Sequence, residues 1–288
     1  MEEIRANLEA AVRKLSEEIG PRSHAQTGRL RLAAEWIAER LGASGCRVRR
    51  QEFGFGGNAY YNVEGEARGE RADGPVLVVG AHYDTVEGTP GADDNASGVA
   101  VMLELARLAA LRPYAGITPR FVAFSLEEPP VFRSSRMGSM VYARSLRQEG
   151  ARVLGMVSLE MLGYYDQARG AQFYPLPVFR WFYPRTADFV GFVGNFASRG
   201  LTERARRAFV AHSSLPAESF SGPSVIPGVD FSDHRSFWKE GFKAFMITDT
   251  AFYRNPHYHG PDDTADTLDF GLMAELTRGL DLALRELG

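Results

Sequence analysis

The sequence predicts an α/β protein in which residues 1–288 form a single domain, with a mostly parallel, mixed central β-sheet and helices on both faces. The first observation is that short apolar runs, typical of buried strands, alternate with amphipathic helical patterns along the whole chain. The second is that no internal repeat or low-complexity linker divides it. The third is that acidic residues and a histidine follow several apolar runs, where parallel sheets carry their functional loops.

The N-terminal elements are two helices and a hairpin. Helical patterns cover residues 2–19 and 27–41, and each is followed by a glycine that ends it. Residues 47–53 and 60–67 are expected to be strands paired around the turn at 54–58. That turn resembles a dinucleotide-binding fingerprint only superficially, because a strand follows it where a phosphate-binding helix would have to begin.

The rest of the chain alternates between strands and helices. The apolar run at 76–79 leads into a turn-rich loop, and a helix follows to about residue 111. Further strands are expected at 121–124, 153–161, 189–193, near 218 and at 242–248. Further helices are expected at 138–148, 202–211, 233–239 and 268–287.

The composition excludes several classes of protein. The chain is 44% hydrophobic and 24% charged with a formal net charge of −3, so neither nucleic acid nor an anionic membrane is expected as a partner. No apolar run approaches the roughly 20 residues that span a bilayer. The N-terminal segment lacks the apolar centre of a signal peptide, so we expect a cytoplasmic protein. Its one cysteine, Cys46, excludes an internal disulfide and a cysteine-rich zinc site, and the oligomeric state stays unknown.

The loop after the 76–79 run carries the first candidate metal ligands. His82 and Asp84 share a face of an extended chain, and a carboxylate there could hold the imidazole in its metal-binding tautomer. A solvated loop histidine would explain the pair as well. Asp93 and Asp94 precede a helix, and a role in capping that helix explains one of them. A carboxylate with one oxygen on each of two metal ions would explain the second.

Glu127 and Glu128 follow the strand at 121–124. Adjacent strand residues point to opposite faces, so both can serve one site only if the chain leaves strand geometry there. Pro129 and Pro130 favour such an irregular exit. One glutamate would then bind metal, and the other would take a proton from a metal-activated water molecule.

The remaining candidates come from two later segments. Glu160 ends an apolar strand, and a plain glutamate at the strand mouth explains it as well as a ligand does. His257 and His259 precede the last helix, where either is explained as a surface histidine. Taken together, two imidazoles and several carboxylates without a thiolate suit zinc, with manganese or cobalt as substitutes.

This ordered set resembles the M28 family of zinc-dependent exopeptidases, of the aminopeptidase Y and leucyl aminopeptidase type. The resemblance rests on six segments: 82–84, 91–98, 124–128, 158–163, 232–234 and 258–264. It implies an aminopeptidase acting on peptides with a free N-terminus. With no protease-associated domain inserted between residues 53 and 76, the chain is similar to the compact form.

The resemblance also implies roles for individual residues. Two zinc ions would be held by five ligands: His82, Asp94, Glu128, Glu160 and His259. His82 and Glu160 would hold one ion, and Glu128 and His259 the other. Asp94, which aligns when counted back from Ser97 and Gly98, would bridge them, and the family often has a cis peptide after it. Glu127 would be the general base and Asp84 the partner behind His82, with Asp233 and His234 in supporting positions.

Departures from the family leave alternatives open. Glu160 stands where many members have aspartate, and Pro129–Pro130 with a basic stretch replaces the usual short turn beside the substrate pocket. Glutaminyl cyclases share this fold but use one zinc ion, and they tend to carry tryptophan where this chain has Tyr258. A catalytically silent metal-binding homologue is a further alternative. A serine hydrolase is not expected, because the chain has no Gly-x-Ser-x-Gly motif.

Overall fold

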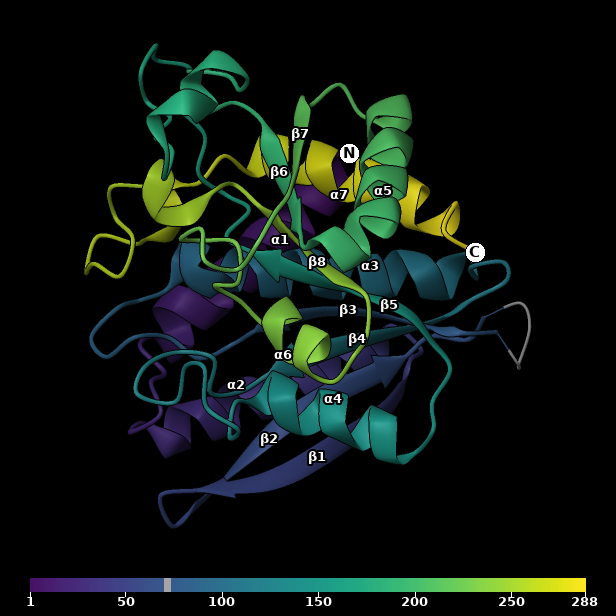
Figure 1. Ribbon diagram of the computed structural model, residues 1–288. Coiled ribbons are helices and arrows are strands. Elements are labelled where there is room, and N and C mark those ends of the chain that lie inside the picture. Colours follow the sequence, from purple (N-terminus) through teal and green to yellow (C-terminus); the bar gives the residue numbers. More distant parts are fainter. Residues whose placement is uncertain (70–73) are drawn as a thin grey trace.

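A computed structural model describes residues 1–69 and 74–288 and contains one eight-stranded sheet (Figure 1). Its strands are β1 (Arg47–Phe55), β2 (Asn58–Glu66), β3 (Val76–His82), β4 (Thr118–Phe124), β5 (Val153–Glu160), β6 (Val190–Gly194), β7 (Ala217–Ser221) and β8 (Ala244–Thr248). They lie in the order β1-β2-β4-β3-β5-β8-β6-β7. The centre, β4-β3-β5-β8, is parallel throughout.

The antiparallel pairings lie toward the two sides of the sheet. β1 and β2 form a hairpin, β2 pairs antiparallel with β4, and β6 pairs antiparallel with β8. β7 then pairs parallel with β6. The predicted mixed, mostly parallel sheet is therefore confirmed. Because β4, β3, β5 and β8 run in one direction, their carboxyl ends meet at one edge.

The described part of the chain has seven α-helices, which cover the sheet on both faces (Figure 1). They are α1 (Glu2–Arg13), α2 (Thr27–Ala43), α3 (Gly98–Leu111), α4 (Gly138–Gln148), α5 (Arg199–His212), α6 (His234–Lys239) and α7 (Phe270–Arg285). Within the described ranges, none of the helices combines the length and apolarity needed to cross a membrane.

The strand periodicity assigns each helix to a face. On β3, Val76 and Val78 pack into a core with Tyr142 of α4 and Phe237 of α6. The alternate residues of β3 point the other way, into the larger core shared with α1, α2, α3, α5 and α7. Of the helices in the described ranges, α4 and α6 therefore cover the first of these two faces.

The predicted elements are present in the predicted order, with small differences at their ends. The first helix continues past α1 as a π-helical segment, Lys14–Ile19, and ends before Gly20. The hairpin strands extend further than expected and leave a tighter turn, because Gly56 and Gly57 adopt positive φ values of 57° and 81°. Two residues with positive φ suit the short turns that join antiparallel strands.

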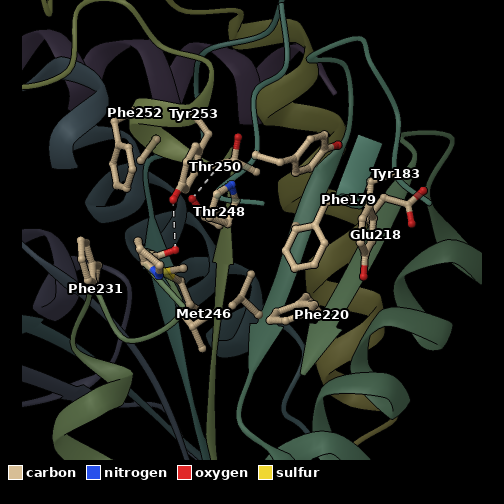
Figure 2. A pocket seen from close by; sticks show the side chains of 18 of the residues that line it. Phe179, Tyr183, Glu218, Phe220, Phe231, Met246, Thr248, Thr250, Phe252 and Tyr253 are labelled. Atoms are coloured by element: carbon tan, nitrogen blue, oxygen red, sulfur yellow. Dashed lines mark hydrogen bonds between the residues drawn. The ribbon is translucent and has the colours of Figure 1, made fainter. Parts of the chain in front are cut away.

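A hollow lies on the face that carries α4 and α6. Helix α6 packs against β5 and β8. Beyond α6, over β8, β6 and β7, three loop segments near residues 172–183, 226–231 and 250–253 surround the hollow (Figure 2). This hollow opens beside the carboxyl end of β5, where Glu160 also lines it.

Candidate metal centre

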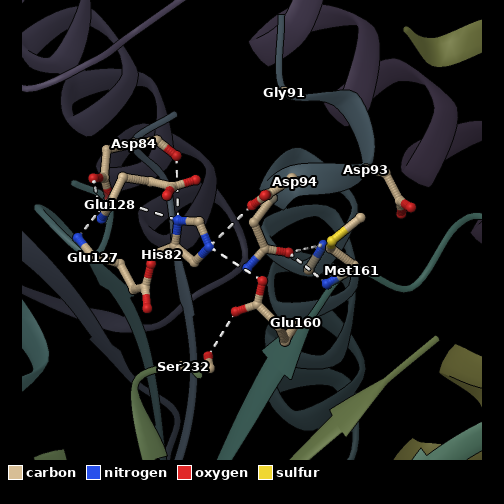
Figure 3. Close-up of polar contacts among 12 residues, drawn as sticks. His82, Asp84, Gly91, Asp93, Asp94, Glu127, Glu128, Glu160, Met161 and Ser232 are labelled. Atoms are coloured by element: carbon tan, nitrogen blue, oxygen red, sulfur yellow. Dashed lines mark hydrogen bonds and ion pairs between the residues drawn. The ribbon is translucent and has the colours of Figure 1, made fainter. Parts of the chain in front are cut away.

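Among the described residues, six polar side chains converge at the edge where the parallel strands end, and Figure 3 labels all of them except His259. They are the predicted site residues His82, Asp94, Glu127, Glu128, Glu160 and His259. His82 is the last residue of β3, and Glu160 is the last residue of β5. All are buried except His259, whose side chain is 29% exposed. The alternative histidine, His257, lies outside the cluster and packs edge-on against Tyr164.

Asp94 lies between two separate pairs of side chains. Its Oδ1 is 3.3 Å from His82 Nε2, which is itself 3.4 Å from Glu160 Oε1. Its Oδ2 is 3.2 Å from His259 Nε2, which is 3.4 Å from Glu128 Oε1. One carboxylate therefore presents one oxygen to each of two histidine–glutamate pairs.

Burial and mutual repulsion dominate the electrostatics of the cluster. Burial raises the pKa of Glu127 well above its usual range, and the charge of Glu128 adds to this. Burial, together with the charge of Asp94, raises the pKa of Glu128 to about 7. For Asp94, burial is outweighed by contacts with His259 and His82, which lower its pKa. A buried cluster of this kind is stabilised by a cation.

The donor set fits two zinc ions. The two triplets that share Asp94 each offer one imidazole nitrogen and two carboxylate oxygens, the nitrogen and oxygen ligands that zinc accepts. Ligand atoms about 2.0–2.1 Å from a tetrahedral zinc ion lie roughly 3.3–3.4 Å apart, close to the separations around Asp94. Asp94 Oδ1 is also buried and has no hydrogen-bond partner among the described residues. Two divalent cations would balance the four carboxylates.

The loop that carries Asp94 is fixed by its neighbour Asn95. The Asn95 amide donates to the Leu159 carbonyl (2.9 Å), and its oxygen accepts from the N–H groups of Met161 and Gly98. The Asp94–Asn95 peptide bond is cis. A Cβ at Gly98 would collide with the Asn95 side chain and the Leu159 carbonyl, so only glycine fits this approach of loop to strand.

Asp93 faces away from the cluster (Figure 3). Its carboxylate accepts hydrogen bonds from Gly163 N–H (2.9 Å) and from the Asn255 amide (2.7 Å). The loop is held from the other side by Asp263, whose two oxygens accept from the N–H groups of Asp93 and Asp94. Asn255 and Asp263 had no predicted role. Asp263 lies in the matched segment 258–264, which is the signal that could have found it.

Asp84 lies next to His82, and its contacts are different from those expected. The Asp84 carbonyl oxygen is 3.2 Å from His82 Nδ1, whereas its carboxylate oxygen Oδ1 is 3.6 Å away. The carboxylate instead accepts hydrogen bonds of 3.1 Å from the N–H groups of both Glu127 and Glu128. Asp84 therefore orients the histidine through its main chain and positions the two glutamates through its side chain.

The two glutamates share one site because the chain leaves strand geometry, as predicted. β4 ends at Phe124, and Leu126 has a positive φ of 62°. The Pro129–Pro130 bond is cis, and Val131 N–H closes a turn onto the Glu128 carbonyl. His82, Glu127 and Glu128 offer ligand atoms within 4.8 Å of one another.

Ser232 is the residue of the 232–234 segment that contacts the cluster. Its hydroxyl donates to Glu160 Oε2 (2.6 Å), which leaves Oε1 facing His82. Asp233 is buried beside the cluster, and burial raises its pKa to about 7. His234 Nε2 donates to the Val229 carbonyl (2.8 Å). The longer side chain of Glu160, in place of the usual aspartate, still reaches the cluster.

Arg22 is a third residue that had no predicted role. It is fully buried, and its guanidinium donates to five main-chain carbonyls: those of Leu15, Gly20, Tyr83, Pro90 and Gly91. Burial lowers its pKa to about 10, against the charges of Asp263 and Asp84. Arg22 thus ties the loop between His82 and Asp94 to the N-terminal segment. In the sequence, the position of Arg22 after Gly20 and Pro21 indicates only the end of a helix.

This arrangement is typical of metal-dependent hydrolases, in which two histidine–carboxylate pairs share one further carboxylate. Residues 62–281 match peptidase family M28, and the chain belongs to that family. The uncharacterized protein YfbL of Escherichia coli is 44% identical over 282 residues, which cover 95% of this chain and 85% of that protein. Leucine aminopeptidase 1 of Trichoderma harzianum is 27% identical over 87% of this chain, but the chain spans only 62% of its length.

Solved structures of the same fold include both peptidases and a cyclase. BSAP, a zinc aminopeptidase from Bacillus subtilis, superposes with a TM-score of 0.78 at 17% identity, over 98% of this chain and 94% of that one. The glutaminyl cyclase of Porphyromonas gingivalis superposes with a TM-score of 0.72 at 21% identity, over 98% of each chain. At these identities the similarity shows the shared fold alone.

Proposed function

We propose that this chain is a zinc-dependent aminopeptidase that hydrolyses the peptide bond after a free N-terminal residue. The observation that carries the proposal is Asp94, whose two oxygens face two separate histidine–glutamate pairs. Membership of peptidase family M28 supports a peptide hydrolase. In the proposal, residues 1–288 act as one catalytic domain, and the cytoplasmic location stays a prediction.

Each residue of the cluster has one role in this proposal. His82 and Glu160 would hold one zinc ion, Glu128 and His259 would hold the other, and Asp94 would offer one carboxylate oxygen to each. Zinc bound there would supply a Lewis acid that polarises a carbonyl group and lowers the pKa of a water molecule.

Glu127 is the remaining carboxylate and acts as the general base. It takes a proton from the attacking water molecule and passes it to the departing amine. Asp84 holds the main chain of Glu127 and Glu128, so it fixes where this proton is received. Tyr258 stacks on the His259 ring with centroids 3.7 Å apart and orients that ligand.

The second candidate is a glutaminyl cyclase, favoured by the similar fold of such an enzyme. That activity needs one zinc ion, whereas the cluster offers two sets of ligand atoms that share Asp94. A silent metal-binding homologue is opposed by the buried Glu127, which the proposed zinc ligands leave free to act as a base.

Hydrolysis of two matched peptides tests the proposal. Zinc-supplemented protein should release leucine from a leucyl peptide and leave the same peptide intact when its N-terminus is acetylated. Glu127→Gln should lower kcat at least about a hundredfold, the smaller end of the contribution of general bases, with unchanged zinc content. Glu35→Gln, on the exposed side of α2, is the matched control.

Each alternative has its own outcome. Cyclisation of an N-terminal glutamine without release of leucine would replace the peptidase with the cyclase. Full activity of Glu127→Gln would refute the assigned base. Bound zinc without either activity would identify the silent homologue.

A further inference from the structure

The hollow over β8, β6 and β7 is lined mainly by aromatic and aliphatic side chains (Figure 2). It measures about 870 Å³, including the part open to solvent. Phe179, Tyr183 and Phe220 surround one end of it, and Phe231 and Phe252 lie toward the other. Among the residues that the structure describes, its lining contains two carboxylates, Glu160 and Glu218, and no lysine or arginine.

The two carboxylates lie at opposite ends of one row across the sheet. Glu160 pairs with Thr248, Thr248 with Gly191, and Gly191 with Glu218. Residues in direct register point to the same face, so this row forms part of the floor of the hollow. Three strand spacings separate the Cα atoms of Glu160 and Glu218 by about 14 Å.

The row has no side chain at Gly191. The three atoms nearest to a Cβ built there belong to Thr248 and Thr250, at 3.5 Å or more, so none of them projects into that place. The next row toward the sheet interior, Met246, Val193 and Phe220, gives the floor an apolar surface. A side chain could therefore extend from the metal cluster along the sheet as far as Glu218.

The carboxylate of Glu218 makes no hydrogen bond or ion pair with any described residue. The charge of Arg206 acts on it, but the Arg206 guanidinium forms a two-bond pair with Glu203 instead. Burial raises the pKa of Glu218, and the charge of Arg206 offsets this only in part. Arg133, which lies over the Phe231 ring at the other end, is paired with Asp230. The hollow therefore offers a negative charge that lacks a direct partner.

We propose that the hollow receives the side chain of the substrate's N-terminal residue and that Glu218 selects a long basic one, lysine or arginine. The proposal rests on the aminopeptidase function proposed above, because the cluster at Glu160 must hold the scissile bond. A leucine side chain ends at its δ carbons, short of β7. Lysine and arginine lay an apolar stem against the aromatic walls and carry their charge further, toward Glu218.

Arginine and citrulline form the sharpest pair of substrates, because they have nearly the same shape and length and differ in charge. With zinc-loaded protein, kcat/KM for arginine p-nitroanilide should exceed that for citrulline p-nitroanilide about tenfold, as expected for one partly desolvated charge pair. Glu218→Gln should bring this ratio close to one. Glu35→Gln, which removes the same charge outside the hollow, should keep it.

Calorimetric binding of free L-arginine and L-citrulline gives a readout that needs no turnover. Arginine should bind about tenfold more tightly to the wild type, and Glu218→Gln should abolish the difference. Cleavage of leucine p-nitroanilide with equal rates for arginine and citrulline would overturn the role of Glu218 and leave the aminopeptidase intact. Absence of all cleavage would refute the aminopeptidase, and equal binding of the two amino acids would then refute the role of Glu218 separately.

Discussion

Replacing Arg22 with methionine should destabilise the loop that joins His82 to Asp94. The guanidinium of Arg22 donates to the carbonyls of Tyr83 (2.6 Å), Pro90 (2.8 Å), Gly91 (3.0 Å) and Leu15 (3.1 Å). Methionine has a similar length but donates no hydrogen bond. The variant therefore leaves these carbonyls without that donor, next to the proposed zinc ligands.

The expected loss comes from the carbonyls that lose their donor. Those of Leu15 and Gly91 keep hydrogen bonds from the N–H groups of Gly20 and Ala96, so the cost falls on Tyr83 and Pro90. A buried polar group left without its partner costs about 1–3 kcal/mol, so these two carbonyls at about 2 kcal/mol each give about 4 kcal/mol. Removing a buried cation returns part of this, because the desolvation of the guanidinium disappears. We therefore expect the free energy of unfolding to fall by about 3 kcal/mol, as measured by urea denaturation of the zinc-loaded protein.

Arg29→Met is the matched control. Arg29 donates a single exposed hydrogen bond to the Pro21 carbonyl, so its loss should cost less than about 0.5 kcal/mol. If Arg22→Met and Arg29→Met unfold within about 0.5 kcal/mol of each other, the role given to Arg22 is wrong.

Four further predictions concern the cluster and its surroundings. Asp84→Asn keeps only one acceptor oxygen for the two N–H groups of Glu127 and Glu128, so we expect the unfolding free energy to fall by about 1–3 kcal/mol in urea titrations and kcat to fall with it. Ser232→Ala frees Glu160 Oε2, so competition with a chelator should show zinc affinity lowered about 10- to 100-fold; unchanged affinity would remove Ser232 from the site. Removal of zinc by a chelator should lower the melting temperature by roughly 10 °C if bound zinc contributes about 4 kcal/mol to the free energy of unfolding, and added zinc should restore it. An unchanged melting temperature would show that the buried carboxylates need no cation. Burial lowers the pKa of His234 from 6.5 to about 4, so between these pH values the unfolded chain binds a proton at this residue and the folded chain does not. The contribution of His234 to the free energy of unfolding is therefore full above pH 6.5 and falls by about 3 kcal/mol toward pH 4. The fall should be smaller in His234→Gln, as measured by urea denaturation at each pH.

The fold could be predicted from the sequence because its periodic signals are local. The alternation of apolar runs and amphipathic segments determined the order of strands and helices, and the helix at Gly138–Gln148 has the predicted bounds. The predicted hairpin turn, residues 54–58, is too long. The torsion angles of Gly56 and Gly57 determine the length of the turn, and hydrophobic periodicity carries no information about them.

The candidate ligands could be named because they follow strand ends in segments that resemble a known family. The residues that position them could not be named in the same way. Arg22 acts through main-chain carbonyls that lie up to 69 positions away, at Gly91, and Asp263 accepts from N–H groups about 170 positions away. Such contacts depend on tertiary packing and leave no spacing in the sequence.

The contacts of the Asp84 side chain likewise could not be predicted from the sequence. Its spacing from His82 led to its predicted place behind the imidazole. Its carboxylate, however, binds the main chain of Glu127 and Glu128, which follow the end of the neighbouring strand. Pairing of β3 with β4 brings these segments together, and the spacing of two residues could not indicate it.

Zinc content per chain is the measurement that tests the central claim most directly. Protein saturated with zinc and then passed into zinc-free buffer should hold two zinc ions per chain by elemental analysis. Asp94→Ala, which removes the carboxylate facing both pairs, should hold at most one. A wild-type chain that binds a single zinc ion, with Asp94→Ala unchanged, would contradict the two-metal site.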